Sequence, residues 1–262
     1  MSRYALVTGA AGDLGRAMCV ALAQDGWSLL LTDHPSQVQG LAATADACAP
    51  SGVEIAVADF DITDPDAADH AVGTLAAEHG VPTAVVANAG VQGDFAPVHE
   101  HDIDVARRVL DVNVIGVFIT VQVAARLMIR AQAGGSIVAM ASMAGLTVAP
   151  NMPAYSASKA AVIGLVKTAS RDLAPHGIRV NAVSPAFIGP GAMWENQVAQ
   201  QAAAGSQYYA TDPETVARQM IDVVPLRRYG ASSEVADVIC FLAGERSSYV
   251  TGINLEVAGG AA

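Results

Sequence analysis

The chain has 262 residues, of which 52% are hydrophobic and 15% are charged. A disordered chain has the reverse composition, and this length suffices to bury the core of one large α/β domain or two small ones. Asp and Glu outnumber Lys and Arg by 25 to 14, which gives a formal net charge of −11. The summed field repels nucleic acids and anionic lipids, so neither is an expected partner.

The cysteines, the histidines and the apolar stretches bear on disulfides, metal binding and location in the cell. Cys19, Cys48 and Cys240 are odd in number, lie far apart and form no CxxC motif, which predicts neither disulfides nor a zinc cluster. The six histidines show no metal-ligand spacing, and no bound metal is expected. The most apolar stretch, Val112–Val123, is shorter than the roughly 20 residues that span a bilayer. We expect no secretory leader, because the residues from Tyr4 onward already read as a strand and turn. We therefore expect a cytoplasmic protein without a membrane anchor.

Apolar runs of strand length alternate with longer segments of helical period along the chain. This alternation predicts an α/β fold, with a doubly wound, Rossmann-like parallel sheet of seven strands and helices on both faces. The expected strands are Tyr4–Thr8, Ser28–Asp33, Val53–Ala58, Thr83–Ala87, Ser136–Ala141, Arg179–Ser184 and Asn254–Val257.

We expect a single domain of residues 1–262. Residues 187–225, which precede a helix near Ser233–Ala243, mix Gly, Pro, Gln and aromatic residues and contain no expected strand. A segment of this kind between strands is interpreted as a substrate lid.

A glycine-rich turn follows the first strand. Gly9, Gly12 and Gly15 would let backbone N–H groups approach a pyrophosphate at the start of the first helix, although their spacing also fits a purely structural turn. Asp33 ends the second strand about 20 residues later, where a carboxylate accepts hydrogen bonds from ribose hydroxyls and repels a 2′-phosphate. This favours NAD over NADP. Two alternatives stay open: Asp33 could serve simply as a cap of the next turn, and Arg16 could contact a phosphate.

With these motifs the chain resembles the short-chain dehydrogenase/reductase family over nearly its whole length. The landmarks, in order, are TGAAGDLG (Thr8–Gly15), DITD (Asp61–Asp64), NAG (Asn88–Gly90), VNVIG (Val112–Gly116), ASMAG (Ala141–Gly145), YSASK (Tyr155–Lys159), IRVNAVSPA (Ile178–Ala186) and the terminal TGINLEVAGG. The resemblance implies a compact single-domain member that binds a nicotinamide cofactor and transfers a hydride at a carbinol or carbonyl carbon.

The resemblance also assigns individual residues. Asn113, Ser142, Tyr155 and Lys159 match the family's catalytic tetrad. The residues expected to bind the cofactor are Gly9, Gly12, Asp13, Leu14, Gly15, Asp33, Asp61, Ile62, Asn88, Ala89, Gly90, Tyr155, Lys159, Pro185 and Ile188. Family members commonly form tetramers, so a homotetramer is expected, assembled through the helices of Asn113 and Tyr155 and through the C-terminal strand.

Three positions depart from the family pattern. Asp13 replaces the middle glycine of the usual TGxxxGxG turn, and Gly12 gives the TGxxGxxG spacing typical of the longer, epimerase-like branch, whereas the length of this chain fits the compact branch. Ala186 replaces the glycine after Pro185, and Pro190 replaces a threonine that commonly holds the nicotinamide carboxamide; Ile188 could offer backbone groups instead. Ala87 replaces the first asparagine of the NNAG motif.

The tetrad residues suit proton transfer. Oxidation of an alcohol at neutral pH needs a base whose pKa is close to 7, whereas the usual pKa of tyrosine is near 10. Tyr155 and Lys159 are four residues apart on one helix, and an ammonium close to the phenol favours the phenolate. Ser142 can hold the substrate oxygen, and Asn113 can anchor a water. Lys159 and Lys167 are the only lysines among 14 basic residues, so lysine stands out at this position.

The expected substrate pocket is mostly apolar, with amide tips. Its residues are Gln92, Ser142, Met143, Asn151, Tyr155, Met193 and Trp194, with Val91 and Phe187 beside them and Tyr208 and Tyr209 on the lid. From Phe187 to Asp222 the only basic residue is Arg218, which disfavours an anionic substrate. We expect an uncharged secondary alcohol or ketone, of the polyol, sugar, cyclic alcohol or steroid class.

Three alternatives remain. The first is an NADPH-dependent ketone or 3-ketoacyl reductase, which Asp33 argues against. The second is a catalytically silent NAD-binding scaffold, suggested by Asp13 and Pro190 but opposed by the complete tetrad. The third is sugar-nucleotide epimerase chemistry, which the glycine spacing suggests and the length opposes.

Overall fold

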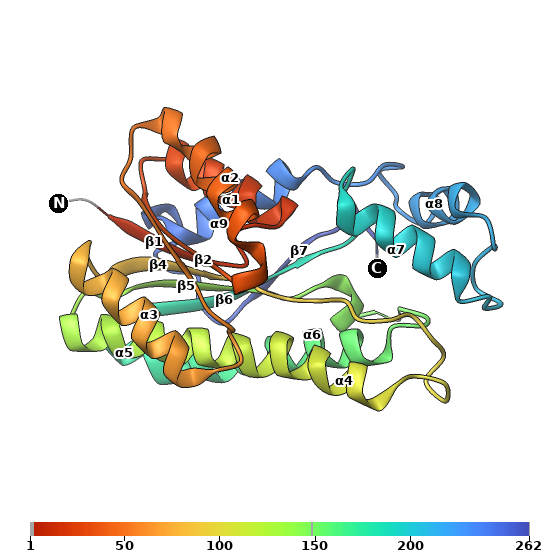
Figure 1. Ribbon diagram of the computed structural model, residues 1–262, viewed down its shortest axis with the longest axis horizontal. Helices are drawn as coiled ribbons and strands as arrows, with labels where there is room; N and C mark the ends of the chain where they lie inside the picture. Colours follow the sequence, from red (N-terminus) through yellow and green to blue (C-terminus); the bar gives the residue numbers. More distant parts are fainter. Residues whose placement is uncertain (1–2, 148, 262) are drawn as a thin grey trace.

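The computed structural model describes residues 3–147 and 149–261, so the two ends and residue 148 of the expected domain lie outside the described residues. It contains one seven-stranded parallel sheet, with strand order β3-β2-β1-β4-β5-β6-β7 (Figure 1). The expected fold class is confirmed. The strands are β1 Tyr4–Thr8, β2 Ser28–Asp33, β3 Ile55–Asp59, β4 Pro82–Ala87, β5 Gly135–Met140, β6 Ile178–Pro185 and β7 Asn254–Val257.

Three strands have the bounds expected from the sequence, and the other four differ by one or two residues. The largest shift is at β3, which begins at Ile55 and not at Val53. The N–H of Leu29 donates to the carbonyl of Glu54 at 2.8 Å, so the pairing with β2 is set by the residue just before Ile55. Hydrophobic character alone does not reveal where this ladder begins.

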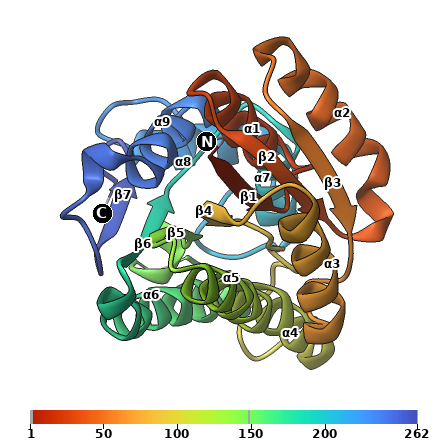
Figure 2. The same cartoon turned by 90° about the vertical axis from the view of Figure 1, so that its left-hand side faces the viewer.

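Helices cover both faces of the sheet (Figures 1 and 2). One face carries α1 (Asp13–Gln24), α2 (Val38–Cys48) and α9 (Ser232–Ala243). The opposite face carries α3 (Pro65–Glu78), α5 (Val117–Ala131) and α6 (Pro153–Leu173), with α4 (Ile103–Leu110) before α5. Short 3₁₀ turns are η1 Pro35–Gln37, η2 Ala49–Ser51, η4 Met143–Gly145, η5 Ala174–His176 and η6 Glu245–Ser247.

The two cores explain why the strands are apolar without alternation. Leu30 and Ile137 point into the cluster with α3, α5 and α6, whereas their neighbours Leu29 and Val138 point into the cluster with α1, α2 and α9. All four side chains are fully buried. Because each strand contributes to both clusters, both of its faces must be apolar.

Helices α4 and α5 are joined by a π-helical turn, η3, at Asp111–Gly116. The continuous helical segment Ile103–Ala131 has a window of mean hydropathy 1.9, long and apolar enough to cross a membrane by composition alone. However, 61% of that window is buried inside the protein, as in a core helix covering a sheet. A π turn of this kind often marks a functional position in a helix.

The segment interpreted as a lid is helical. It forms α7 (Ala192–Ala203) and α8 (Pro213–Asp222), which extend past the carboxyl ends of the strands (Figure 1). These helices share a small buried cluster formed by Trp194, Val198, Ala202, Val216 and Met220. The lid therefore has a core of its own.

The connections reverse direction at β1, which pairs with β2 on one side and β4 on the other. In sheets of this type the loops leaving the two strands diverge to opposite faces and open a crevice at the carboxyl ends, where ligands bind. The glycine turn follows β1 directly and therefore lies at this switch point.

Two glycines of this turn provide a test of its packing. A Cβ atom at Gly15 would overlap the carbonyl oxygen of Gly9, whereas one at Gly12 would meet no atom closer than 3.9 Å. We expect Gly15→Ala to lower the free energy of unfolding by roughly 1–3 kcal/mol, the usual cost of overpacking, and Gly12→Ala by only about 0.5 kcal/mol. Denaturant unfolding of the purified variants would measure both values. Equal values would contradict the packing described for Gly15.

Candidate active site

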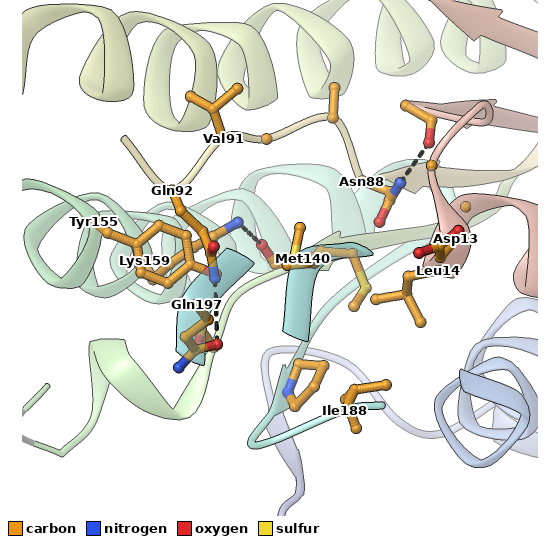
Figure 3. Close-up of a pocket in the computed structure, with 18 of the residues that line it drawn as sticks. Asp13, Leu14, Asn88, Val91, Gln92, Met140, Tyr155, Lys159, Ile188 and Gln197 are labelled. Carbon is orange, nitrogen blue, oxygen red and sulfur yellow. Dashed lines mark hydrogen bonds between the residues drawn. The ribbon is translucent and has the colours of Figure 1, made fainter. Parts of the chain in front are cut away.

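A crevice of about 1030 Å³ runs along the carboxyl ends of the strands, from the glycine turn to the lid. Figure 3 shows Asp13, Leu14 and Asn88 at one end, Tyr155, Lys159, Gln92 and Gln197 at the other, and Met140 between them. All fifteen residues expected to bind a cofactor line this crevice. The structure thus brings these sequence-distant residues into one cavity.

The glycine turn is held against the end of β4. The side-chain amide of Asn88 donates to the carbonyls of Thr8 at 3.1 Å and Gly9 at 2.9 Å, and the Thr8 hydroxyl accepts from the backbone N–H groups of Asn88 and Ala89. Gly9 has φ +65°, and a Cβ atom there would lie 2.8 Å from the Cα atom of Ala89. Only glycine allows the two loops to approach so closely.

Asp33 lies at the end of β2 and faces the crevice. Its carboxylate accepts hydrogen bonds from the backbone N–H groups of Ala11, at 2.8 Å, and His34, at 2.7 Å. These bonds fix the carboxylate beside the glycine turn and leave further lone pairs for a ligand. Arg16, the alternative phosphate contact, is turned toward the Thr44 hydroxyl at 3.3 Å and is not part of the crevice wall.

Asp61 and Ile62 follow β3 and form the next part of the wall. Partial burial raises the pKa of the Asp61 carboxyl, but hydrogen bonds from Thr63 and the charge of Arg108, 3.5 Å away, outweigh this effect and hold the pKa below its usual value. Asp61 is therefore ionised at neutral pH. Arg108 also lines the crevice at this end.

Lys159 extends into the crevice from α6. The side chain is 4% exposed, and its Nζ atom donates to the carbonyl of Met140 at 2.8 Å, as drawn in Figure 3. Burial disfavours the charged form and lowers the pKa of Lys159 to about 8. The ammonium can therefore change its charge within the physiological range.

Tyr155 lies one helical turn before Lys159 and faces the same cavity. The Nζ atom of Lys159 is 5.6 Å from the centre of the Tyr155 ring. Burial raises the pKa of the Tyr155 phenol, and the hydroxyl of Ser142 shifts it in the opposite direction. The burial effect is larger, so the pKa of Tyr155 is raised in the protein without a cofactor. The lowered pKa expected from the sequence therefore requires additional positive charge near the phenol.

Asn113, the fourth tetrad residue, is fully buried in the π turn and does not line the crevice. Its Oδ1 atom accepts from the N–H of Val91 at 2.8 Å, while Nδ2 donates to the Val91 carbonyl at 2.8 Å and to the Ser158 hydroxyl at 3.0 Å. Both ends of the amide are thus used to hold the loop after β4 against α6. In this geometry Asn113 is a positioning residue.

Asp13, the departure in the glycine turn, has a partner in the lid. Its Oδ2 atom accepts from the backbone N–H of Ala192, the first residue of α7, at 2.9 Å. The residue before this helix is Gly191, which has no side chain to cap it. Asp13 provides that cap from 179 positions away and thereby joins the glycine turn to the lid.

The expected substrate residues divide into two groups. Gln92, Ser142, Met143, Tyr155, Met193 and Trp194 line the crevice, as do Val91, Phe187 and Tyr209. Asn151 does not line it; its side-chain amide donates to Gln201 at 2.7 Å and to Ser206 at 3.0 Å. Asn151 therefore ties the loop after β5 to the lid, while Tyr208 is 60% exposed outside the cavity.

Sequence reasoning missed Gln197 and Gln201, which line the crevice from α7. The signal was present in the helical spacing, because Trp194, Gln197 and Gln201 recur every three to four residues and so share one face of the helix. Because the sequence did not predict a helix over this segment, it did not show which of its residues lie on the same face.

Comparisons with known proteins agree with this architecture. The family model described as short chain dehydrogenase matches residues 3–202. The 3-oxoacyl-(acyl-carrier-protein) reductase FabG of Staphylococcus aureus is 31% identical over 262 residues, which cover 99% of this chain and 98% of the relative. The crystal structure of an NAD⁺-bound xylitol dehydrogenase has a TM-score of 0.95 and 44% identity, with 98% of each chain covered.

A second solved structure, carveol dehydrogenase from Mycobacterium avium in complex with NAD, has a TM-score of 0.91 and 31% identity and covers 99% of this chain and 97% of that one. The family match extends over most of the chain, and the relatives are matched along nearly their whole length. The chain is therefore an oxidoreductase of the short-chain dehydrogenase/reductase family.

Proposed function

We propose that the protein transfers a hydride between NAD and an uncharged secondary alcohol or ketone. The observation that carries the proposal is the grouping of Tyr155, Lys159 and Ser142 in one crevice that begins at the glycine turn and passes Asp33. The residues that line the substrate half are uncharged: Val91, Gln92, Met143, Phe187, Met193, Trp194, Gln197 and Tyr209.

The crevice fits a dinucleotide cofactor. The open space next to Gly12, at the N-terminus of α1, suits a pyrophosphate, because helix N-termini attract anions. Asp33 would bind the adenosine ribose, Asp61 and Ile62 would flank the adenine, and Lys159 would contact the other ribose. Pro185 and Ile188 would border the nicotinamide. When bound, the nicotinamide supplies the carbon that accepts or donates the hydride.

The chain's own groups handle the proton. Tyr155 removes the hydroxyl proton of the alcohol, or returns it to the ketone, while the Ser142 hydroxyl holds the substrate oxygen. The positive charge of Lys159 favours the phenolate and so opposes the burial effect on Tyr155. Asn113 contributes by holding the loop of Val91, which borders both the tetrad and the substrate half.

The preference for NAD rests on charge. The carboxylate of Asp33 would repel a 2′-phosphate, and Arg16 is engaged with Thr44. The two similar solved structures also contain NAD. A second candidate is a 3-ketoacyl reductase, which the FabG relative favours by its identity along the whole chain. The uncharged residues around the substrate half, from Gln92 to the lid, argue against an anionic carrier substrate.

We propose a cytoplasmic homotetramer. Ile115 and Phe118, near the start of α5, are about half exposed, which suits a contact with another subunit.

The catalytic role of Tyr155 has a direct test. Purified protein with NAD should oxidise members of a panel of uncharged secondary alcohols, measured by the absorbance of reduced nicotinamide. Tyr155→Phe should lower kcat by about 10²- to 10⁴-fold, because the acid–base group is lost, and should leave NAD affinity in calorimetry unchanged. Tyr249→Phe, at a fully exposed tyrosine, serves as the control and should retain activity.

Other outcomes separate the alternatives. NAD binding without turnover of any substrate would favour a silent scaffold. Reduction of a 3-ketoacyl substrate with NADPH, in preference to all alcohols with NAD, would favour the second candidate. Substantial activity in Tyr155→Phe would remove the tyrosine from its role.

Asp33 should set the cofactor preference. Asp33→Ala should lower the ratio of kcat/KM with NAD to kcat/KM with NADP by at least about tenfold, since a charged hydrogen-bond partner of the ribose is lost and the 2′-phosphate is no longer repelled. The matched control is Asp59→Ala, which pairs in register with Asp33 on β3 but does not line the crevice. An unchanged ratio in Asp33→Ala would contradict the assignment.

The buried Lys159 should make stability depend on pH. Its pKa of about 8 in the folded state is below the usual 10.5, so the unfolded chain binds more protons between these values and stability rises with pH. Compared with Lys159→Met, the wild type without cofactor should gain about 1 kcal/mol of unfolding free energy per pH unit from pH 8 to 10. Denaturant unfolding across this range would measure the difference, and a constant difference would contradict the buried ammonium.

A further inference from the structure

Two glutamines meet across the substrate half of the crevice. Gln92 lies in the loop after β4, two positions beyond the NAG motif, and Gln197 lies on lid helix α7. The Nε2 atom of Gln92 donates to the Oε1 atom of Gln197 at 3.4 Å, as drawn in Figure 3, and both residues line the same crevice as Tyr155 and Lys159. The pair therefore lies in the cavity of the reacting groups and spans from the loop after β4 to the lid.

The pair has unused hydrogen-bonding capacity. Within residues 3–147 and 149–261, the Oε1 atom of Gln92 and the Nε2 atom of Gln197 have no hydrogen-bond partner, and both side chains are only partly buried. The one bond between them is long for an N–H···O contact. One carbonyl acceptor and one amide donor are thus available to a ligand.

The surrounding wall offers a ligand few other hydrogen-bonding groups. Met143, Met152, Phe187, Met193 and Trp194 line this part of the crevice with apolar surface. Gln201, the other glutamine of α7, is engaged on both sides, because its Oε1 atom accepts from Asn151 and its Nε2 atom donates to the Pro150 carbonyl at 2.9 Å. Gln92 and Gln197 are the neutral amides that remain available in this half of the described crevice.

We propose that Gln92 and Gln197 together bind a second hydroxyl group of the substrate, so that the enzyme prefers diols and polyols to mono-alcohols. A hydroxyl both donates and accepts, and it can therefore accept from Gln197 Nε2 while donating to Gln92 Oε1. An apolar substrate would cover the same two groups without replacing their bonds to water, which carries a penalty. This inference rests on the proposed function and narrows its substrate class.

The test compares substrates that differ only in additional hydroxyls. With NAD, kcat/KM is measured for a pentitol against 2-pentanol and for 2,3-butanediol against 2-butanol. In the wild type the hydroxylated member of each pair should be favoured by at least about tenfold. Gln92→Met and Gln197→Met should each lower kcat/KM for the hydroxylated substrates by about tenfold and for the mono-alcohols by less than about twofold.

The double variant and a control make the test specific. Because both glutamines bind the same hydroxyl, the combined loss in Gln92→Met/Gln197→Met should be smaller than the product of the single losses. Gln200→Met, the same change on the same helix at a residue outside the crevice, should leave both substrate classes unaffected. Calorimetry with NAD verifies that each variant is folded.

The outcomes separate this inference from the function on which it rests. Turnover of mono-alcohols as efficient as that of their hydroxylated partners, or equal losses on both classes in the glutamine variants, would overturn the role of the pair while leaving the alcohol dehydrogenase intact. Turnover of neither class, together with no turnover of any other alcohol or ketone in the panel, would overturn the proposed function and this inference together.

Discussion

The crevice depends on the hydrogen bonds that join the carboxyl ends of β1 and β4. The Asn88 amide and the Thr8 hydroxyl satisfy backbone groups of both loops at the point where the connections diverge. Without these bonds, buried N–H and carbonyl groups at the switch point would lack partners, at a cost of about 1–3 kcal/mol each. Thr8 and Asn88 also line the cavity. The hydrogen bonds that stabilise the junction of the two loops therefore also determine the geometry of the site.

Beyond this junction, the reacting groups are arranged by residues that do not enter the cavity. Asn113 uses its whole amide on Val91 and Ser158, which fixes the loop of the substrate half against α6. A Cβ atom at Gly90 would lie 3.2 Å from Asn113 Oδ1 and 3.4 Å from Lys159 Nζ, so the small residue permits both groups to approach the same loop. A rigid surrounding shell of this kind is what allows a titratable lysine to be kept in a buried position.

Much of the architecture follows from the sequence, because the signals are local or belong to a long ordered series of motifs. The all-apolar strands report burial on both faces, and the spacing of Tyr155 and Lys159 places them on one helix face whatever the rest of the fold does. Residues whose roles depend on a distant partner are different. Asn151 was expected in the pocket and instead binds Gln201 and Ser206. Asp13 departs from the glycine pattern of the family, and its partner lies in the lid. No local pattern specifies such contacts.

The cap that Asp13 provides means that the lid is not a self-contained module. Helix α7 has its own small core with α8, yet its first N–H is satisfied by the first helix of the chain. Transplanted onto a relative with glycine at the position of Asp13, the lid would keep its apolar packing and lose the group that fixes its entry to the cavity. Exchange of substrate lids among members of this family would therefore have to carry residue 13 along with the lid.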